Sequence, residues 1–369
     1  MPPSKAIKSA HYEWKEFMKS DKWLAASRYL IYRTLYDRRC GFVDGRCPRI
    51  ADASFPRQEI YDSFQLMEWL KDEVRRATQE GTAALMLSGG IDSAILARFM
   101  PKGSVVYTLK CIVPGVEVTD ETAMAARYAQ ACGLEQRVVS VYWEDYEALA
   151  SLLMRHKGAP IHSIEVQIHK AALRAKKDGF SKLIFGENAD IIYGGMDGLL
   201  AKDWTFGDFV ERYTYVMPYK VLRNPVLDLS LFLQHEKNGH IDGHEFVNDV
   251  FRAEALGSYH NACEMAGIEF CGPFSTSRMA TPIDYARIRS GDTKYLVREV
   301  FRTLYPGWGM PKKIPMPRPM NEWMKSWNGP IRPEFWPDCV TSLLGDQKWM
   351  VWALERFLGD LEDSLNEQS

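Results

Sequence analysis

Short apolar runs alternate with helical patterns between residues 82 and 200, and this alternation constrains the fold more than any other feature of the sequence. The run Ala83–Leu87 stops at Ser-Gly-Gly, as a buried parallel strand does, and Ala94–Met100 continues as a helix. Further strands are expected at Val105–Leu109, Arg137–Val141 and Lys182–Phe185. Repeated strand–helix units predict an α/β fold, a doubly wound parallel sheet covered by helices on both faces.

We expect three parts along the chain. Residues 1–58, rich in Tyr, Trp and Arg, are expected to form an N-terminal helical and irregular extension. Residues 59–204 are the α/β core, whose first element is expected to be an amphipathic helix over Gln58–Glu80. Residues 205–369 show no repeated strand pattern and are expected to form a helical C-terminal part.

Charge and composition exclude several classes of protein. The formal net charge is −2 with no long run of one sign, so nothing indicates nucleic-acid binding. The seven cysteines are an odd number scattered through a long chain, unlike a disulfide framework. No stretch approaches the ~20 consecutive apolar residues of a membrane span, and no apolar signal core follows the N-terminus. We therefore expect a cytoplasmic enzyme.

The segment Ser88-Gly89-Gly90-Ile91-Asp92-Ser93 lies between the first strand and its helix. Gly89 and Gly90 let the backbone approach an anion with no Cβ in the way, and Ser88 and Ser93 can donate hydroxyl hydrogen bonds. The helix start also favours negative charge. Asp92 would repel a phosphate directly, so we expect it to hold the Mg²⁺ that phosphates bring. A Gly-Ser turn without a ligand is the alternative.

This loop lacks the lysine of the Gly-x4-Gly-Lys-Ser/Thr loop of P-loop NTPases. It resembles instead the Ser-Gly-Gly-x-Asp-Ser loop of the N-type ATP pyrophosphatases, which grips the pyrophosphate that leaves when the α-phosphate is captured. The resemblance implies an adenine nucleotide alpha-hydrolase-like fold for the core. It also implies ATP and Mg²⁺ as ligands, with the adenine beside the second strand near Leu109.

A second segment indicates one branch of that group. Gly186-Glu187-Asn188-Ala189-Asp190-Ile191-Ile192-Tyr193-Gly194-Gly195 resembles the Gly-Glu-Gly-Ala-Asp-Glu-x-Phe-Gly-Gly segment of asparagine synthetases and the related β-lactam synthetases. The resemblance implies that Gly186 contacts the nucleotide and Asp190 supplies the second Mg²⁺ carboxylate. Glu187 would position or deprotonate the nucleophile. A helix cap at Asp190 and an exposed loop charge at Glu187 are the alternative.

Weaker resemblances run through the C-terminal part. Lys294–Arg298 is similar to the family's Lys-x-x-Leu-Arg. Pro311-Lys312-Lys313, with Pro319 and Trp323, is similar to its Arg-x-Lys-x-Gly-Phe followed by Pro and Trp. Counting back from that Pro and Trp places Lys313 on the family's catalytic lysine, which stabilises charge on the α-phosphate. Lys312 is one residue away, and the choice between the two lysines stays open.

The sequence also departs from the family pattern. Asn188 stands in place of a glycine and Ile191 in place of an acid. After Pro273-Phe274, Ser275-Thr276 stand where the family's Pro-Phe-Leu-Asp has Leu-Asp. Residue 2 is proline, whereas the glutaminase of glutamine-dependent members has an N-terminal catalytic cysteine. We therefore expect the nitrogen to come from free ammonia, a separate glutaminase subunit or an amine of the substrate.

The resemblance implies an asparagine-synthetase-like, ATP-dependent carbon–nitrogen ligase that forms AMP. A small-molecule carboxylate would be adenylated with release of pyrophosphate, and ammonia or an amine would then form the amide. A homo-oligomer is left open. One rival is an ATP pyrophosphatase that modifies tRNA or a nucleobase, and another is a nucleotide-binding subunit without catalysis.

Overall fold

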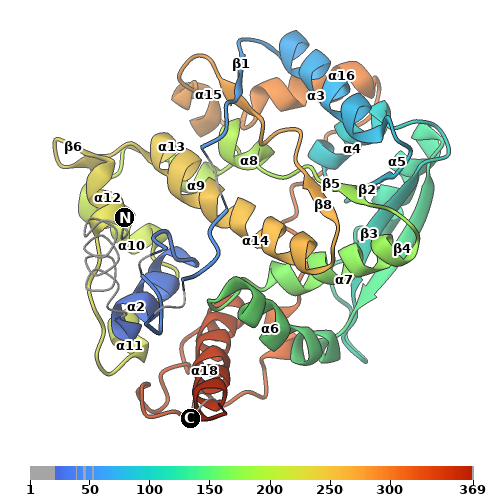
Figure 1. The fold of residues 1–369 in the computed structure, drawn as a ribbon. Coiled ribbons are helices and arrows are strands. Elements are labelled where there is room, and N and C mark those ends of the chain that lie inside the picture. The colour runs from blue at the N-terminus through green and yellow to red at the C-terminus, as the bar shows by residue number, and fades with distance from the viewer. Residues whose placement is uncertain (1–20, 39, 45–46, 52–53, 368–369) are drawn as a thin grey trace, which may run out of the picture.

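The structure is a computed structural model that describes residues 21–38, 40–44, 47–51 and 54–367 (Figure 1). Of the expected N-terminal extension, one helix lies within this part, α2 (Lys22–Tyr32). The Asp21 carboxylate caps it by accepting hydrogen bonds from the amides of Trp23 and Leu24. The helices expected in residues 1–20, including the segment around Trp14, lie outside the described residues.

A five-stranded parallel sheet forms the centre of the molecule, in the order β4-β3-β2-β5-β8. Its strands are β2 (Ala83–Met86), β3 (Val105–Cys111), β4 (Glu135–Val141), β5 (Lys182–Ile184) and β8 (Glu269–Cys271). The four strands expected from the apolar runs are all present, so the predicted doubly wound α/β fold is confirmed.

Helices cover both faces of this sheet (Figure 1). Successive side chains of a strand point to opposite faces. Leu85 therefore packs into the cluster under α3 (Ser63–Thr78), α4 (Ile91–Phe99), α5 (Thr122–Cys132) and α16 (Tyr295–Leu304). Its neighbour Ala84 packs into the opposite cluster, under α7 (Ile164–Lys177) and α14 (Arg252–Met265). Both faces are buried under helices, which explains why the strands are continuous apolar runs in the sequence.

The first expected helix begins later than predicted. Residues Gln58–Ile60 form a short strand, β1, which pairs in parallel with β9 (Ser277–Met279). Helix α3 starts only at Ser63, because the Asp62 carboxylate accepts a hydrogen bond from the Gln65 amide at 2.8 Å and caps it. The helical spacing of apolar residues extended across this cap and did not reveal it.

Residues 205–369 are mostly helical, and they also contain short strands that the sequence did not reveal. The strand β8 completes the main sheet, β9 pairs with β1, and β6 (Glu236–Lys237) pairs with β7 (His240–Ile241). Each is two or three residues long, too short for an alternating pattern to be visible. Because β8 lies beyond residue 204, the expected end of the α/β core does not coincide with the end of the sheet.

The C-terminal helix α18 (Gly345–Asn366) packs with α2 and α6 (Trp143–Lys157) around a separate core that contains Tyr146 and Trp349. The remaining helices are α8 (Ala189–Ile192), α9 (Asp197–Leu200), α10 (Phe206–Tyr213), α11 (Pro218–Val221), α12 (Ser230–Gln234), α13 (Gly243–Phe246), the π-helical turn η1 (Val247–Phe251), α15 (Tyr285–Arg289) and α17 (Met320–Trp323). In the described part of the chain, no helix has the length and apolar character that a membrane crossing requires.

Candidate active site

A cavity of about 250 Å³ opens at the carboxyl ends of β2 and β5. The chain runs outward from β2 through β3 to β4 on one side, and through β5 to β8 on the other. Ligands of doubly wound sheets bind at such a reversal of strand order. Much of the lining comes from three segments, the loop after β2, the loop after β5 and the stretch Met310–Pro317. Residues from β3, α7, α14 and the start of α16 also line it.

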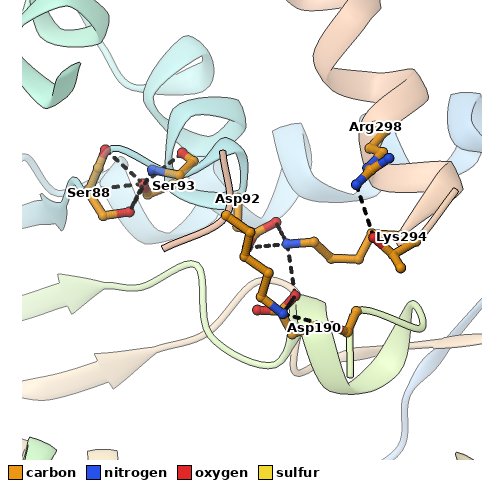
Figure 2. A network of polar contacts seen from close by, with 10 residues as sticks. Ser88, Asp92, Ser93, Asp190, Lys294 and Arg298 are labelled. Carbon is orange, nitrogen blue, oxygen red and sulfur yellow. Dashed lines mark hydrogen bonds and ion pairs between the residues drawn. The ribbon is translucent and has the colours of Figure 1, made fainter. Parts of the chain in front are cut away.

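The loop after β2 is braced by its own serine hydroxyls (Figure 2). The Oγ atoms of Ser88 and Ser93 lie 2.9 Å apart, and the Ser88 amide donates to Ser93 Oγ at 3.0 Å. The Gly90 amide donates to Ser88 Oγ at 3.2 Å. Helix α4 begins directly afterwards at Ile91, so its first amides face the cavity end of the loop.

Gly186 lies against this loop so closely that a side chain cannot be accommodated. A Cβ atom at Gly186 would lie 2.9 Å from the Ser93 amide nitrogen and 3.1 Å from the Asp92 carbonyl carbon. These neighbours are backbone atoms and cannot move aside cheaply. The glycine therefore fixes the spacing between the loops that follow β2 and β5.

Four charged side chains meet across the cavity (Figure 2). Lys294, the residue before α16, places its ammonium 2.9 and 2.8 Å from the two carboxylate oxygens of Asp92. The same ammonium lies 3.0 Å from Asp190 Oδ1. Lys313 Nζ lies 3.1 Å from that Asp190 oxygen and donates to the Gly195 carbonyl at 2.7 Å. Two cations thus balance two carboxylates.

Burial and mutual attraction set the protonation of this cluster. Burial raises the pKa of Asp190, but Lys294 and Lys313 outweigh it and hold the pKa below its usual value. Burial raises the pKa of Asp92 above its usual value, with Lys294 opposing and Asp190 adding to the rise. Burial alone would lower the pKa of Lys294, yet the two carboxylates raise it. Lys294 is therefore charged.

The two carboxylates suit a divalent cation. Carboxylate oxygens are the ligands that Mg²⁺ prefers, and it is commonly held by one or two of them together with substrate phosphates. The Lys294 ammonium contacts both Asp92 and Asp190, so a positive charge is already accommodated between them. No group of three or more His, Cys, Asp or Glu side chains able to hold a metal occurs among the described residues.

Glu187 lies beside this cluster, on the same loop as Gly186. Burial raises the pKa of its carboxyl to about 7, while a hydrogen bond from the Tyr259 hydroxyl on α14 opposes the rise. Both side chains line the cavity. A carboxyl that titrates near neutrality can accept a proton from a reacting group and later release it.

A fourth carboxyl of the cavity lining, Glu121, contacts the phosphate loop at Gly89. Glu121, the residue before α5, accepts a hydrogen bond from the Gly89 amide, and burial raises its pKa to about 7. Gly89 itself does not belong to the cavity lining. Its predicted contact with ATP therefore stays a prediction.

The proline-rich segment between α16 and α17 forms a loop. Residues Met310–Pro317 line the cavity opposite the sheet. The Pro317 carbonyl anchors the segment by accepting hydrogen bonds from Cys111 Sγ at 3.2 Å and Gln167 Nε2 at 3.2 Å. Leu109, on the strand that carries Cys111, lines the same cavity, as its predicted place beside the adenine requires.

The structure brings nearly all predicted site residues to this one cavity. Its lining includes Ser88, Gly90, Asp92, Ser93, Leu109, Gly186, Glu187, Asp190 and Lys313, together with Lys312. Lys313 rather than Lys312 reaches Asp190. Sequence reasoning assigned no role to Lys294, Tyr259 or Glu121. Lys294 begins a segment similar to the family's Lys-x-x-Leu-Arg, and that was the only signal for any of the three.

Two departures from the family pattern meet in space. Asn188 has φ 69°, the left-handed region that favours glycine, which stands at this position in the family pattern. Its side-chain amide donates to Ser275 Oγ at 2.9 Å, and both residues are buried. Asparagine is among the few other residues that adopt this conformation readily. The exchange therefore keeps the backbone shape of the loop.

A family model for asparagine synthase matches residues 65–266, which is more than half of the 369-residue chain. The chain belongs to the asparagine synthase family. The match contains the phosphate loop, Gly186–Gly195 and Tyr259, but ends before Lys294 and Lys313. The family assignment agrees with the ATP-pyrophosphatase type indicated by the Ser-Gly-Gly-x-Asp-Ser loop.

Known proteins resemble the chain over part of its length. The NH(3)-dependent NAD(+) synthetase of Alkaliphilus oremlandii is 27% identical over 143 residues, 36% of this chain and 56% of that protein. The match therefore spans little more than half of that relative.

Among solved structures, an NH3-dependent NAD synthetase of Campylobacter jejuni is 15% identical, with a TM-score of 0.25 over 37% of this chain and 61% of that one. An NMN synthetase of Francisella tularensis is 14% identical, with a TM-score of 0.24 over 66% and 90%. A U34-tRNA thiolase of Methanococcus maripaludis is 15% identical, with a TM-score of 0.24 over 69% and 91%. Likenesses at this level add nothing to the family assignment.

Proposed function

We propose that the protein is an AMP-forming carbon–nitrogen ligase that adenylates a small-molecule carboxylate and joins it to ammonia or an amine. The observation that carries this proposal is the cluster in which Lys294 bridges Asp92 and Asp190 beside the phosphate loop. Such a cluster supplies fixed charge where a pyrophosphate would leave. Family membership supports the use of ATP.

In the first step, an oxygen of the substrate carboxylate attacks the α-phosphorus of ATP. The bond from that phosphorus to the bridging oxygen breaks, and pyrophosphate leaves with the electron pair. The loop Ser88–Ser93 and the start of α4 would hold the phosphates. Asp92 and Asp190 would hold Mg²⁺, which when bound supplies positive charge next to the leaving pyrophosphate.

In the second step, the nitrogen nucleophile attacks the acyl carbon of the adenylate, and AMP leaves. The nitrogen must lose a proton, and Glu187 is suited to accept it because its pKa is raised to about 7 by burial. Lys313, held at 3.1 Å from Asp190, would lie close enough to stabilise negative charge on the α-phosphate. Positioning and charge stabilisation would carry most of the rate.

The substrates follow from the same chemistry. The acceptor is a small carboxylic acid, and the nitrogen comes from free ammonia, from a separate glutaminase subunit or from an amine of the acceptor itself. We place the reaction in the cytoplasm and leave self-association to measurement.

The test is the release of pyrophosphate and AMP from ATP and Mg²⁺, measured against a panel of carboxylic acids with and without ammonia. Asp92→Ala should abolish the release of pyrophosphate and AMP that depends on the added carboxylic acid. Asp72→Ala is the matched control, since Asp72 is an exposed aspartate of α3 paired with Arg75. Release of ADP and phosphate instead of AMP and pyrophosphate would contradict attack at the α-phosphorus.

A further inference from the structure

A second cavity, of about 840 Å³, shares no lining residue with the candidate active site. It lies between residues 50–51 and 54–57, the strand β9 and the start of α14. Four arginines line it: Arg38, Arg57, Arg252 and Arg278. Asp249 is the one acidic side chain among the described residues of its lining.

Ion pairs between the described residues neutralise only part of this positive charge. Arg278 pairs with Glu59 on β1, and Asp249 pairs with His235 as well as facing the cavity. Arg57 differs from both. Its Nη1 atom is buried and has no hydrogen-bond partner among the residues that the structure describes. A buried donor in that state loses its water without a replacement, which is costly unless a ligand supplies the acceptor.

The arginines also disfavour one another's charge. Burial lowers the pKa of Arg57, and the neighbouring Arg278 lowers it further. Burial lowers the pKa of Arg252 to about 10, and Arg57 adds to that effect. An isolated guanidinium has a pKa above 12. A bound anion would relieve both the burial of charge and the repulsion between cations.

Guanidinium groups recognise phosphate and carboxylate oxygens through paired hydrogen bonds. One wall of the cavity is apolar, because Ile50, Phe55 and Pro56 line it. The Phe55 ring lies 5.8 Å from the Arg252 guanidinium carbon. We propose that this cavity is a binding site for a small anionic metabolite, held through a phosphate or carboxylate group by Arg57, Arg252 and Arg278. The proposal does not depend on the reaction assigned to the active site.

The site is not an extension of the phosphate loop, because α8 stands between the two. One end of this short helix carries Asp190, and the Tyr193 hydroxyl just beyond its other end lies 2.7 Å from Ser277 Oγ, next to Arg278. Helix α8 also packs against η1, which carries Asp249. Binding at the two cavities can therefore be measured separately.

The experiment is calorimetric titration of the full chain at low salt, with citrate and inorganic phosphate as separate probes. We expect Arg57→Gln to weaken the binding of the preferred probe at least tenfold. Arg49→Gln is the matched control, because Arg49 is an exposed arginine paired with Glu264 outside the cavity, and it should leave the affinity unchanged. Ser93→Ala, which alters the phosphate loop, should also leave it unchanged. The probe that binds tighter distinguishes a phosphate from a carboxylate ligand.

Several results would overturn the proposal. These are no binding of either probe at millimolar concentration, equal weakening by Arg57→Gln and Arg49→Gln, or loss of binding in Ser93→Ala. Asp52 falls outside the described residues. If binding appears only after Asp52→Asn, the Asp52 carboxylate already neutralises the arginines of the cavity and the proposal is wrong. Should Arg57→Gln fail to fold, Arg278→Gln, at a half-exposed position, provides the same comparison.

Discussion

Replacing Lys294 by methionine keeps much of the length of the side chain and removes the cation that bridges Asp92 and Asp190. The lysine is nearly fully buried, with 6% of its surface exposed. Without it, Lys313 alone faces two carboxylates, and of these two it contacts only Asp190. Asp92 would keep a partly buried charge with no cation in contact.

The magnitude follows from burial. Removing one partner of a fully buried ion pair costs about 3–5 kcal/mol. The side chains of Asp92 and Asp190 keep 20% and 34% exposure, so water screens part of the loss. We therefore expect Lys294→Met to lower the free energy of unfolding by about 2 kcal/mol at neutral pH.

The assay is urea unfolding without Mg²⁺ and without nucleotide, because a metal ion would replace the missing charge. Lys71→Met is the control, since Lys71 forms an exposed pair with Glu68 and should change stability by less than about 0.5 kcal/mol. Equal effects of the two substitutions at neutral pH would refute the reasoning.

The effect should also depend on pH. The folded-state pKa of Asp190 is depressed, so its pairing contributes stability above the unfolded pKa and loses it as pH falls through the folded value. The difference between wild type and Lys294→Met should shrink in acid, where the carboxylates become protonated. A difference that stays constant into strong acid would show that the lysine contributes packing rather than charge.

Two further substitutions test the loop after β5. Glu187→Gln should abolish the rise in ligase rate as pH passes about 7, the pKa to which burial raises this carboxyl, as a pH–rate profile would reveal. Because that pKa is raised, wild type should lose stability relative to Glu187→Gln as pH increases through about 7, and thermal unfolding at pH 5 and pH 8 would show it. Gly186→Ala should weaken ATP binding and cost about 1–3 kcal/mol of stability, since its Cβ would lie 2.9 Å from the Ser93 amide nitrogen. Gly257→Ala on α14, where a Cβ has nothing within 4 Å, is its control and should be neutral or stabilising.

Local sequence patterns predicted the parts of the site that follow directly from strands. The loop Ser88–Ser93 and the segment from Gly186 to Asp190 each leave the end of an apolar run, and parallel strands bring such ends to one edge. This prediction used only the ends of the strands and did not depend on the residues between them. The parallel arrangement places both segments at one edge, whereas the pairing of Asp92 with Asp190 was implied by the resemblance to asparagine synthetases.

Contacts between distant segments could not be predicted in the same way. Lys294 is 202 positions from Asp92, and no local pattern says that its ammonium enters the cavity. Tyr259 is one of several apolar or aromatic residues on α14, and its hydroxyl reaches Glu187 only because α14 packs along the sheet. The strand β8 was missed for another reason, since three residues are too few to show a period.

The exchange at position 188 bears on whether the site works as a catalyst. The loop needs a left-handed backbone at this position, and a residue confined to φ below zero would reshape the segment that carries Glu187 and Asp190. Asn188 retains φ 69°, and Ser275, at the other departure from the family pattern, accepts its hydrogen bond. Both changes lie behind the loop, while Glu187 and Asp190 on either side of Asn188 still line the cavity. The two departures therefore change the support of the loop but leave Glu187 and Asp190 in the cavity lining, as the ligase that we propose requires.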